Sequence, residues 1–214
     1  MKTLLFVLLL IAGQNFKARS QTQTNIISSS IDIKDVEKSN KMLELLGSKS
    51  KKKKQTAIDS VLANPNSFNP TVTYMLSNLL LKQDKKNEAM FWFYLSQVRA
   101  RVDANICKDN TAKQAVSILN MTFGPTINKI AFLNFDTLKV VVEKVVAFTK
   151  SNEETYDRRW INLHGMDAVI SGLDKDSKQN ETSESIDKWP DIKKTTVESY
   201  YADFIKYAIN KEKD

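Results

Sequence analysis

Apolar side chains return about once per helical turn through most of this chain, and this spacing predicts an all-α fold. The clearest stripe comprises Val72, Met75, Leu76, Leu79 and Leu80. Asn69 suits a helix N-cap and Pro70 the first helical position, because proline's missing N–H removes no intrahelical bond there. We therefore expect a helix that begins at Pro70 and ends at a polar turn over 83–87.

The following segment, 88–102, is apolar on two sides. One side carries Ala89, Phe93 and Ala100, and the other carries Phe91, Leu95, Val98 and Val102. A helix that is apolar on more than one side belongs in the middle of a bundle. The aromatic run that begins at Phe91 predicts the densest part of the core, the alternative being an aromatic ligand cage.

Four further helices are expected between residues 31 and 132. One covers 31–46 and ends where Gly47 offers a left-handed stop, and a shorter one covers 55–63. Thr111 with Gln114 fits a capping box for the third. Gly124-Pro125 is expected to break that helix, with a short helix over 126–132 beyond it.

Residues 137–149 are rich in valine, a composition compatible with a strand as well as with a helix. Strict alternation would place Lys144 on one face with Val140 and Val142, whereas helical spacing leaves Lys144 outside the apolar stripe. The spacing therefore favours a helix, with Asp136 as its cap.

Two more caps are expected near the C-terminus. Asp157 is predicted to cap the segment after it, and Thr195 with Glu198 forms a second capping box for a strongly amphipathic last helix. Together these elements predict an irregular helical bundle.

The segment around 70–100 resembles one helical hairpin of the tetratricopeptide and Sel1-like repeats. Ala89 takes the place of the packing alanine, Trp92 and Phe93 stand in the aromatic positions, and Ser96 in the later small position. Asp84 stands where the repeats carry a turn glycine, and Ser77 where they carry a small glycine. The run from Phe91 to Arg101 is also similar to a family of exported bacterial proteins without assigned activity. The resemblance implies hairpin geometry and names no partner.

The N-terminus has the pattern of an export signal. Lys2 precedes an apolar run over 4–12, and Ala18-Arg19-Ser20 supplies small residues for cleavage before Gln21. An uncleaved anchor is the alternative, although the run is shorter than the ~20 residues that a membrane span needs. The predicted organisation is a signal peptide over 1–20, a flexible lead-in over 21–30, and one helical domain over 31–214 with a mobile segment near 172–188.

Charge is concentrated in one short run. Loss of Lys2, Lys17 and Arg19 with the leader lowers the formal net charge from +7 to +4. Leaving out the five lysines at 49 and 51–54 as well brings it to −1. The body of the protein therefore lacks the composition of a nucleic-acid-binding protein, and the lysine run is expected to be a solvated linker beside a loop.

Familiar chemical sites are missing from the sequence. The single cysteine, Cys107, and the single histidine, His164, exclude a disulfide framework and a zinc centre with several imidazoles. No phosphate loop, nucleophile elbow or calcium loop is present. We therefore expect no metal, no cofactor and no catalytic residues that a motif would reveal.

The candidate partner-binding residues are Arg99, Arg101, Arg158, Arg159 and His164. If the two arginine segments meet, they form either an internal ion-pair network with carboxylates such as Asp103 or a site for an anionic partner.

The expectation is a non-catalytic protein that is exported to the periplasm or secreted and binds another protein, without membrane insertion after the leader is removed. An envelope hydrolase with unrecognised carboxylates is the alternative. A component that contacts the envelope through its lysine run is a third possibility.

Overall fold

The computed structural model describes residues 31–173 and 182–211. The helices of this part are α2 (Ile33–Leu46), α3 (Lys51–Ala63), η1 (Pro65–Ser67), α4 (Pro70–Lys82), α5 (Lys86–Ile106), α6 (Gln114–Ala131), α7 (Phe135–Ser151), η2 (Arg158–His164), α8 (Met166–Leu173), η3 (Ile186–Lys188) and α9 (Trp189–Lys211). Within these residues there is no strand, and Cys107 and Ser183 form an isolated antiparallel bridge. The predicted all-α helical bundle is therefore confirmed, while the predicted signal peptide and lead-in lie outside the described residues.

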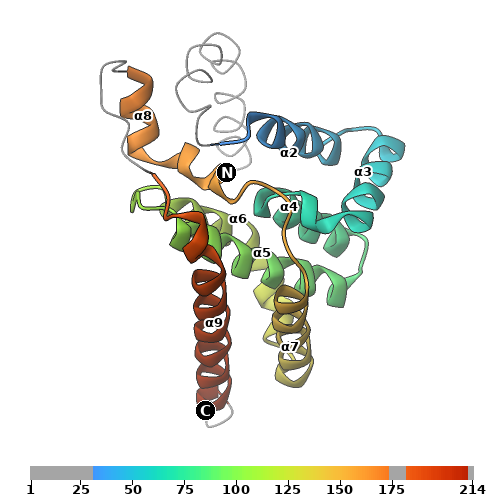
Figure 1. Ribbon diagram of the computed structural model, residues 1–214. Coiled ribbons are helices and arrows are strands. Elements are labelled where there is room, and N and C mark those ends of the chain that lie inside the picture. Colours follow the sequence, from blue (N-terminus) through green and yellow to red (C-terminus); the bar gives the residue numbers. More distant parts are fainter. Residues whose placement is uncertain (1–30, 174–181, 212–214) are drawn as a thin grey trace.

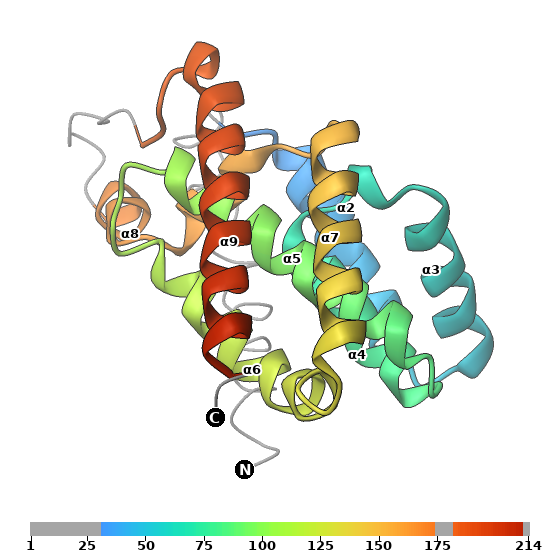
Figure 2. The same cartoon turned by 90° about the horizontal axis from the view of Figure 1, so that it is seen from below.

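Helix α5 is the central element of the bundle. It packs against α4, α6, α7, α9 and η2, whereas α2 and α3 pack against each other and against α4. Figures 1 and 2 show α2, α3 and α4 on one side of the molecule and α8 on the other. Seen from below, α7 and α9 lie side by side across α5 (Figure 2). This central position explains why α5 is apolar on two sides, because neighbouring helices pack against both of them.

Aromatic rings join α4, α5 and α6 in the core. Phe93 of α5 is fully buried, and its ring lies edge-on to Tyr74 of α4 with centroids 5.6 Å apart. Tyr74 also stacks on Phe123 of α6 at 5.6 Å. Gly124 of α6 packs against the same ring, since a Cβ there would lie 3.4 Å from Phe93. Trp92, Phe93 and Tyr94 of the aromatic run are therefore buried in the core, whereas Phe91 is only partly buried.

The expected break at Gly124-Pro125 is wrong, because α6 continues through it with Pro125 inside the helix. Proline removes the bond to the carbonyl four residues earlier, at Met121. Met121 is 69% exposed and Pro125 is also exposed, so water can reach that carbonyl. Beyond the proline, Ile127 and Ala131 are buried in the core, and their packing offsets the lost bond.

The first two helices also depart from expectation. Gly47 ends α2 with a φ of −79°, so the predicted left-handed stop is wrong. Helix α3 begins at Lys51 and not at residue 55, with the Ser50 hydroxyl accepting a hydrogen bond from Lys53 N at 3.4 Å. The lysine run is therefore the first turn of a helix, and the predicted linker is wrong.

Two predicted caps are present. The side-chain oxygen of Asn69 accepts from Thr71 N at 3.2 Å, with Pro70 at the first position of α4. That of Asp157 accepts from Arg159 N at 2.9 Å, although the helix that follows is a 3-10 helix.

Two other predicted caps are wrong. Asn134, and not Asp136, caps α7 by accepting from Thr137 N at 2.8 Å. Thr195 lies inside α9, which already begins at Trp189. Both sequence patterns are local, whereas the earlier turns carry the partly buried Phe135 of α7 and Trp189 of α9, which pack against the core.

Thr111 does not form the predicted capping box with Gln114. Its hydroxyl donates to Asp109 at 2.6 Å, and the same carboxylate accepts from Asp167 N at 3.1 Å. Gly165 lies against this carboxylate, since a Cβ there would be 2.0 Å from Asp109 Oδ2. The Asp109 side chain thus joins the turn before α6 to the start of α8.

Residues 182–188 connect α8 to α9 along the end of α5. Lys108 N donates to Thr182 O at 2.9 Å, and Glu184 N donates to Ile106 O at 2.8 Å. The expected mobile segment near 172–188 thus includes a stretch with defined contacts, while 174–181 lie outside the described residues.

Asp84, in the turn between α4 and α5, has a backbone conformation that favours glycine. Its φ of 60° is positive, and its side chain is 86% exposed. Glycine adopts this conformation without the steric cost that a Cβ brings, so Asp84→Gly is expected to raise the free energy of unfolding by roughly 0.5–1 kcal/mol. Urea denaturation measures the change. Asp84→Asn, which removes the charge and keeps the Cβ, should change stability by much less; an equal gain in both variants would contradict the backbone explanation.

Candidate functional site

Charged side chains from three segments meet in a buried group, which we call the ion-pair cluster: Arg99, Asp103, Glu154, Arg158 and Lys193. Arg158 Nη1 lies 2.9 Å from Asp103 Oδ1, and its Nη2 pairs with Glu154. Arg99 Nε lies 3.3 Å from Glu154 Oε1, and Lys193 Nζ lies 3.0 Å from Glu154 Oε2. The side chains of Arg99, Asp103 and Glu154 are fully buried. Helix α5, the loop before η2 and helix α9 are thus joined by charge.

Asp103 is the most heavily hydrogen-bonded carboxylate of the cluster. Besides Arg158, its Oδ2 accepts from the Tyr156 hydroxyl and from the Trp160 indole N–H, both at 2.8 Å. Burial raises the pKa of Asp103 to about 6, against the opposing effects of Arg158, Trp160 and Tyr156. Burial also holds the pKa of Tyr156 well above its ordinary value, and the negative charge of the nearby Asp103 carboxylate adds to this effect. At neutral pH the phenol is therefore a donor and the carboxylate an acceptor.

Arg99 is committed to contacts inside the protein. Its guanidinium donates to Pro65 O at 3.0 Å and to the side chain of Asn66, and lies 5.7 Å from the ring centre of Phe148. Of the two alternatives for Arg99 and Arg158, the structure contains the internal ion-pair network. Its carboxylate partners are Asp103, which the sequence suggested, and Glu154, which it did not.

The remaining candidate residues have partners of their own. The Arg101 guanidinium lies 4.9 Å from the ring centre of Tyr200. Arg159 binds Asp157 through two nitrogens, at 2.8 and 2.7 Å. His164 is exposed, and its ring packs edge-on against Trp160 at 5.5 Å. The structure therefore brings Arg99 and Arg158 together through Glu154 and leaves Arg101, Arg159 and His164 outside the cluster.

A depression of about 670 Å³ lies above the ion-pair cluster, between the end of α7 and the start of α9. Its lining residues include Lys150, Glu153, Glu154, Tyr156, Arg158, Trp189, Lys193, Lys194 and Glu198. General acid catalysis needs a carboxyl group whose proton can reach a substrate. The carboxylate of Glu154 is instead paired with Arg99, Arg158 and Lys193, whereas Glu153 and Glu198 also line the depression.

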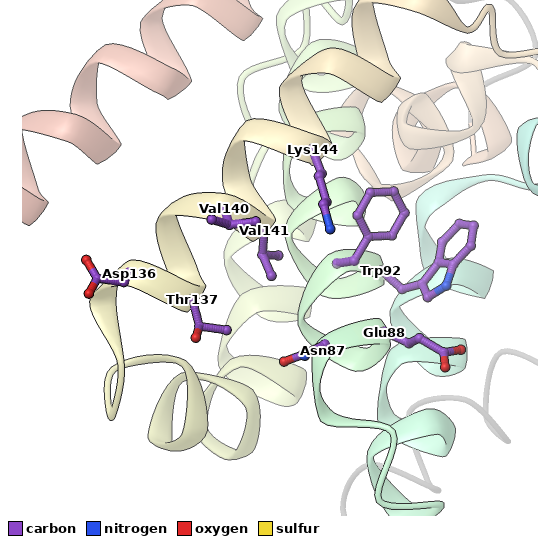
Figure 3. Close-up of a pocket in the computed structure, with 9 residues that line it drawn as sticks. Asn87, Glu88, Trp92, Asp136, Thr137, Val140, Val141 and Lys144 are labelled. Carbon is purple, nitrogen blue, oxygen red and sulfur yellow. The ribbon is translucent and has the colours of Figure 1, made fainter.

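A second depression, of about 480 Å³, lies between α5 and α7 (Figure 3). We call it the α5–α7 groove, and it is lined by Asn87, Glu88, Phe91, Trp92, Asp136, Thr137, Val140, Val141 and Lys144. Figure 3 shows Lys144 extending from α7 into the groove, with Asn87 and Asp136 at the opposite end. The groove therefore has an apolar floor with a positive end and an acidic end.

Two side chains of this groove are unusual for a packed core. Val140 is 48% exposed, although its neighbours Val141 and Val142 are buried. Trp92 is only 7% exposed, and its indole N–H donates to no described residue, although water can reach the nitrogen. The N–H groups of Trp160 and Trp189, by contrast, both donate at hydrogen-bonding distance. Tryptophans that combine a buried apolar body with a water-accessible N–H are typical of binding surfaces.

The sequence contains a local signal for the α5–α7 groove and none for the carboxylate and ammonium that complete the ion-pair cluster. At helical spacing Leu138, Val141 and Val145 form an apolar stripe that excludes Val140, and this pattern could have marked Val140 as exposed. Glu154 and Lys193 had no such signal, because they are 39 residues apart and meet only in the folded chain.

Residues 31–173 and 182–211 contain neither a metal-binding group nor a membrane-spanning helix. No group of three or more His, Cys, Asp or Glu side chains there is placed to hold a metal ion. No helix in the same residues combines the length and the apolar character that crossing a membrane requires.

Comparison with known proteins adds no relative from which a function can be transferred. No protein-family model, no curated protein and no solved structure matches this chain. The resemblance of the α4–α5 segment to tetratricopeptide and Sel1-like repeats stays a prediction.

Proposed function

We propose that this chain is a non-catalytic, exported helical protein that binds a partner protein through the α5–α7 groove. The observation that carries the proposal is the half-exposed Val140 in a groove whose lining also includes the aromatic side chains of Phe91 and Trp92. An apolar side chain of a partner that covers Val140 would remove this exposed apolar surface from water.

Aromatic contacts hold the floor of the groove in place. The ring of Phe91 contacts Trp92 edge-on at 5.3 Å and Phe148 edge-on at 5.7 Å. Phe148 in turn lies beside the buried Arg99 of the ion-pair cluster. A floor already held in place loses little conformational entropy when a partner binds, which favours affinity.

The charges at the two ends define the occupant as an amphipathic helix of the partner. Helices α5 and α7 both begin at the acidic end, near Glu88 and Asp136, and Lys144 lies toward the other end (Figure 3). A partner helix that lies in the groove antiparallel to α5 and α7 has its N-terminus near Lys144 and its C-terminus near Glu88 and Asp136. Helices commonly carry acidic residues at their start and basic residues at their end, so such a helix matches the groove in charge as well as in dipole.

Capture of the mature protein from its native compartment, with a photo-cross-linking residue at position 140, tests the proposal. Val140→Glu is expected to weaken binding of the captured partner at least tenfold, because it places a charge on the apolar contact. Ala147→Glu is the matched control, since Ala147 is exposed on the same helix outside the groove.

A cross-link that maps to a helix of one stoichiometric partner supports the proposal. Equal partner binding by the two variants would contradict the groove as the site. Turnover of a cell-wall substrate by the purified protein, without any partner, would contradict the non-catalytic assignment. The mass of the exported form tests cleavage before Gln21 independently.

A further inference from the structure

Two lysine-rich segments that are distant in sequence lie at one corner of the molecule. Gln83 Nε2 in the α4–α5 turn donates to Gln55 Oε1 in α3 at 3.0 Å, across 28 residues of sequence. Figure 2 shows the start of α3 and the α4–α5 turn at the same corner. We call the lysines of these two segments the lysine corner: Lys49, Lys51, Lys52, Lys53, Lys54, Lys82, Lys85 and Lys86.

Most charges of the lysine corner are uncompensated. Lys85 pairs with Glu88 at 3.9 Å and Lys86 with Asp84 at 3.4 Å, and all four of these side chains are largely exposed. Such pairs contribute little energy in water. The other six lysines form no ion pair with any described residue, and all of them except the half-buried Lys54 are exposed.

Fold stability does not explain these lysines. Four of them, at 51–54, occupy the first turn of α3, where the positive end of the helix dipole favours acidic residues. Each cation there opposes the helix, and adjacent like charges add to the cost. A local pattern that works against stability is expected where function requires it.

The chemistry of the cations selects the kind of ligand. Arginine binds phosphate through a fixed two-pronged geometry, whereas lysine is a hydrated point charge on a flexible stem. The lysine corner contains no arginine, and Arg99, Arg101, Arg158 and Arg159 are all engaged elsewhere. A surface made of lysines alone suits a diffuse layer of negative charge better than a shaped anion. Stacking of nucleic-acid bases requires aromatic side chains, and the lysines of 51–54 are not interleaved with any.

We propose that the lysine corner adsorbs the protein onto the surface of a bilayer that contains anionic phospholipids. The contact is peripheral and electrostatic, and no segment enters the hydrocarbon. Each lysine near such a surface adds to binding, so the six uncompensated lysines make adsorption strong at low salt and weak at high salt.

Co-sedimentation with vesicles tests this proposal. The full-length mature protein is mixed with vesicles of phosphatidylcholine alone or with 30% phosphatidylglycerol, at about 0.05 M and about 0.3 M NaCl. Binding is expected only to the anionic vesicles and mainly at the lower salt. The variant Lys51→Gln, Lys52→Gln, Lys53→Gln, Lys54→Gln is expected to bind about 100-fold more weakly.

The matched control removes the same net charge from other surfaces: Lys129→Gln, Lys139→Gln, Lys150→Gln and Lys206→Gln, all exposed. Its vesicle binding should fall much less. A further variant, Lys82→Gln, Lys85→Gln, Lys86→Gln, should weaken binding by about tenfold if the fold joins the two segments into one surface.

An equal loss in the 51–54 variant and in its control would overturn the proposal, because net charge alone would then account for binding. So would tighter binding to heparin or RNA than to the anionic vesicles. The Val140→Glu variant should keep its vesicle binding, so failure of the groove and failure of the lysine corner are distinguishable.

Discussion

Asp103→Ala is expected to lower the free energy of unfolding by about 3–5 kcal/mol, the largest effect of any single change in the ion-pair cluster. The substitution leaves the Arg158 guanidinium without one of its two buried carboxylates. It also leaves the Tyr156 hydroxyl and the Trp160 indole N–H without their acceptor. Buried donors without partners are costly because water cannot replace the lost bond.

Urea denaturation at neutral pH measures this effect. Asp136→Ala is the control, because Asp136 is exposed and its loss should change stability by less than about 0.5 kcal/mol. Similar losses in the two variants would mean that the ion-pair cluster does not hold the fold together.

The pH dependence of stability is a second readout of the same carboxyl group. Burial raises the pKa of Asp103 from 3.8 to about 6, so the folded state holds this proton more tightly than the unfolded state. The protonated Asp103 carboxyl therefore contributes at most about 3 kcal/mol to the free energy of unfolding. This contribution is fully present below about pH 4 and is lost as the pH rises through about 6. Asp103→Asn cannot titrate, so the difference in stability between wild type and this variant should change with pH across that interval. A constant difference would contradict the raised pKa.

Phe93→Ala is expected to cost about 3–5 kcal/mol, because it opens a cavity at the point where three helices meet. The Phe93 ring is fully buried and contacts Tyr74 and Tyr94, with centroids 5.6 and 5.1 Å away. Gly124 of α6 approaches the same ring, and its backbone cannot extend to fill the space. The change should therefore loosen α4, α5 and α6 together.

Thermal and urea unfolding of Phe93→Ala and Phe132→Ala measure this difference. Phe132 is 43% exposed, so the same truncation there should cost less than about 1 kcal/mol. A loss at Phe132 as large as at Phe93 would show that the aromatic core of α5 does not dominate stability.

Local patterns predicted the parts of this protein that depend on neighbours in sequence. The helical class follows from apolar side chains at helical spacing, and the caps at Asn69 and Asp157 follow from short side chains that reach their own backbone. The two apolar sides of α5 likewise predicted that it is central. Each of these features has its cause within a few residues of chain.

Features that depend on burial were missed even where the local pattern was clear. Pro125 ends a helix in isolation, yet α6 continues because Ile127 and Ala131 find a core beyond it. The lysines of 51–54 indicated a loop, yet α3 begins with them because Ala57, Ile58 and Val61 are buried.

The candidate sites were decided by the tertiary structure. The sequence named Arg99, Arg158 and Asp103 as possible partners, but the carboxylate of Glu154 and the ammonium of Lys193 joined them only through the packing of α5 and α9. The α5–α7 groove and the lysine corner arose in the same way, from helices brought side by side. Short-range periodicity in sequence determines which segments become helices, whereas which side chains meet depends on how those helices bury their apolar faces against one another.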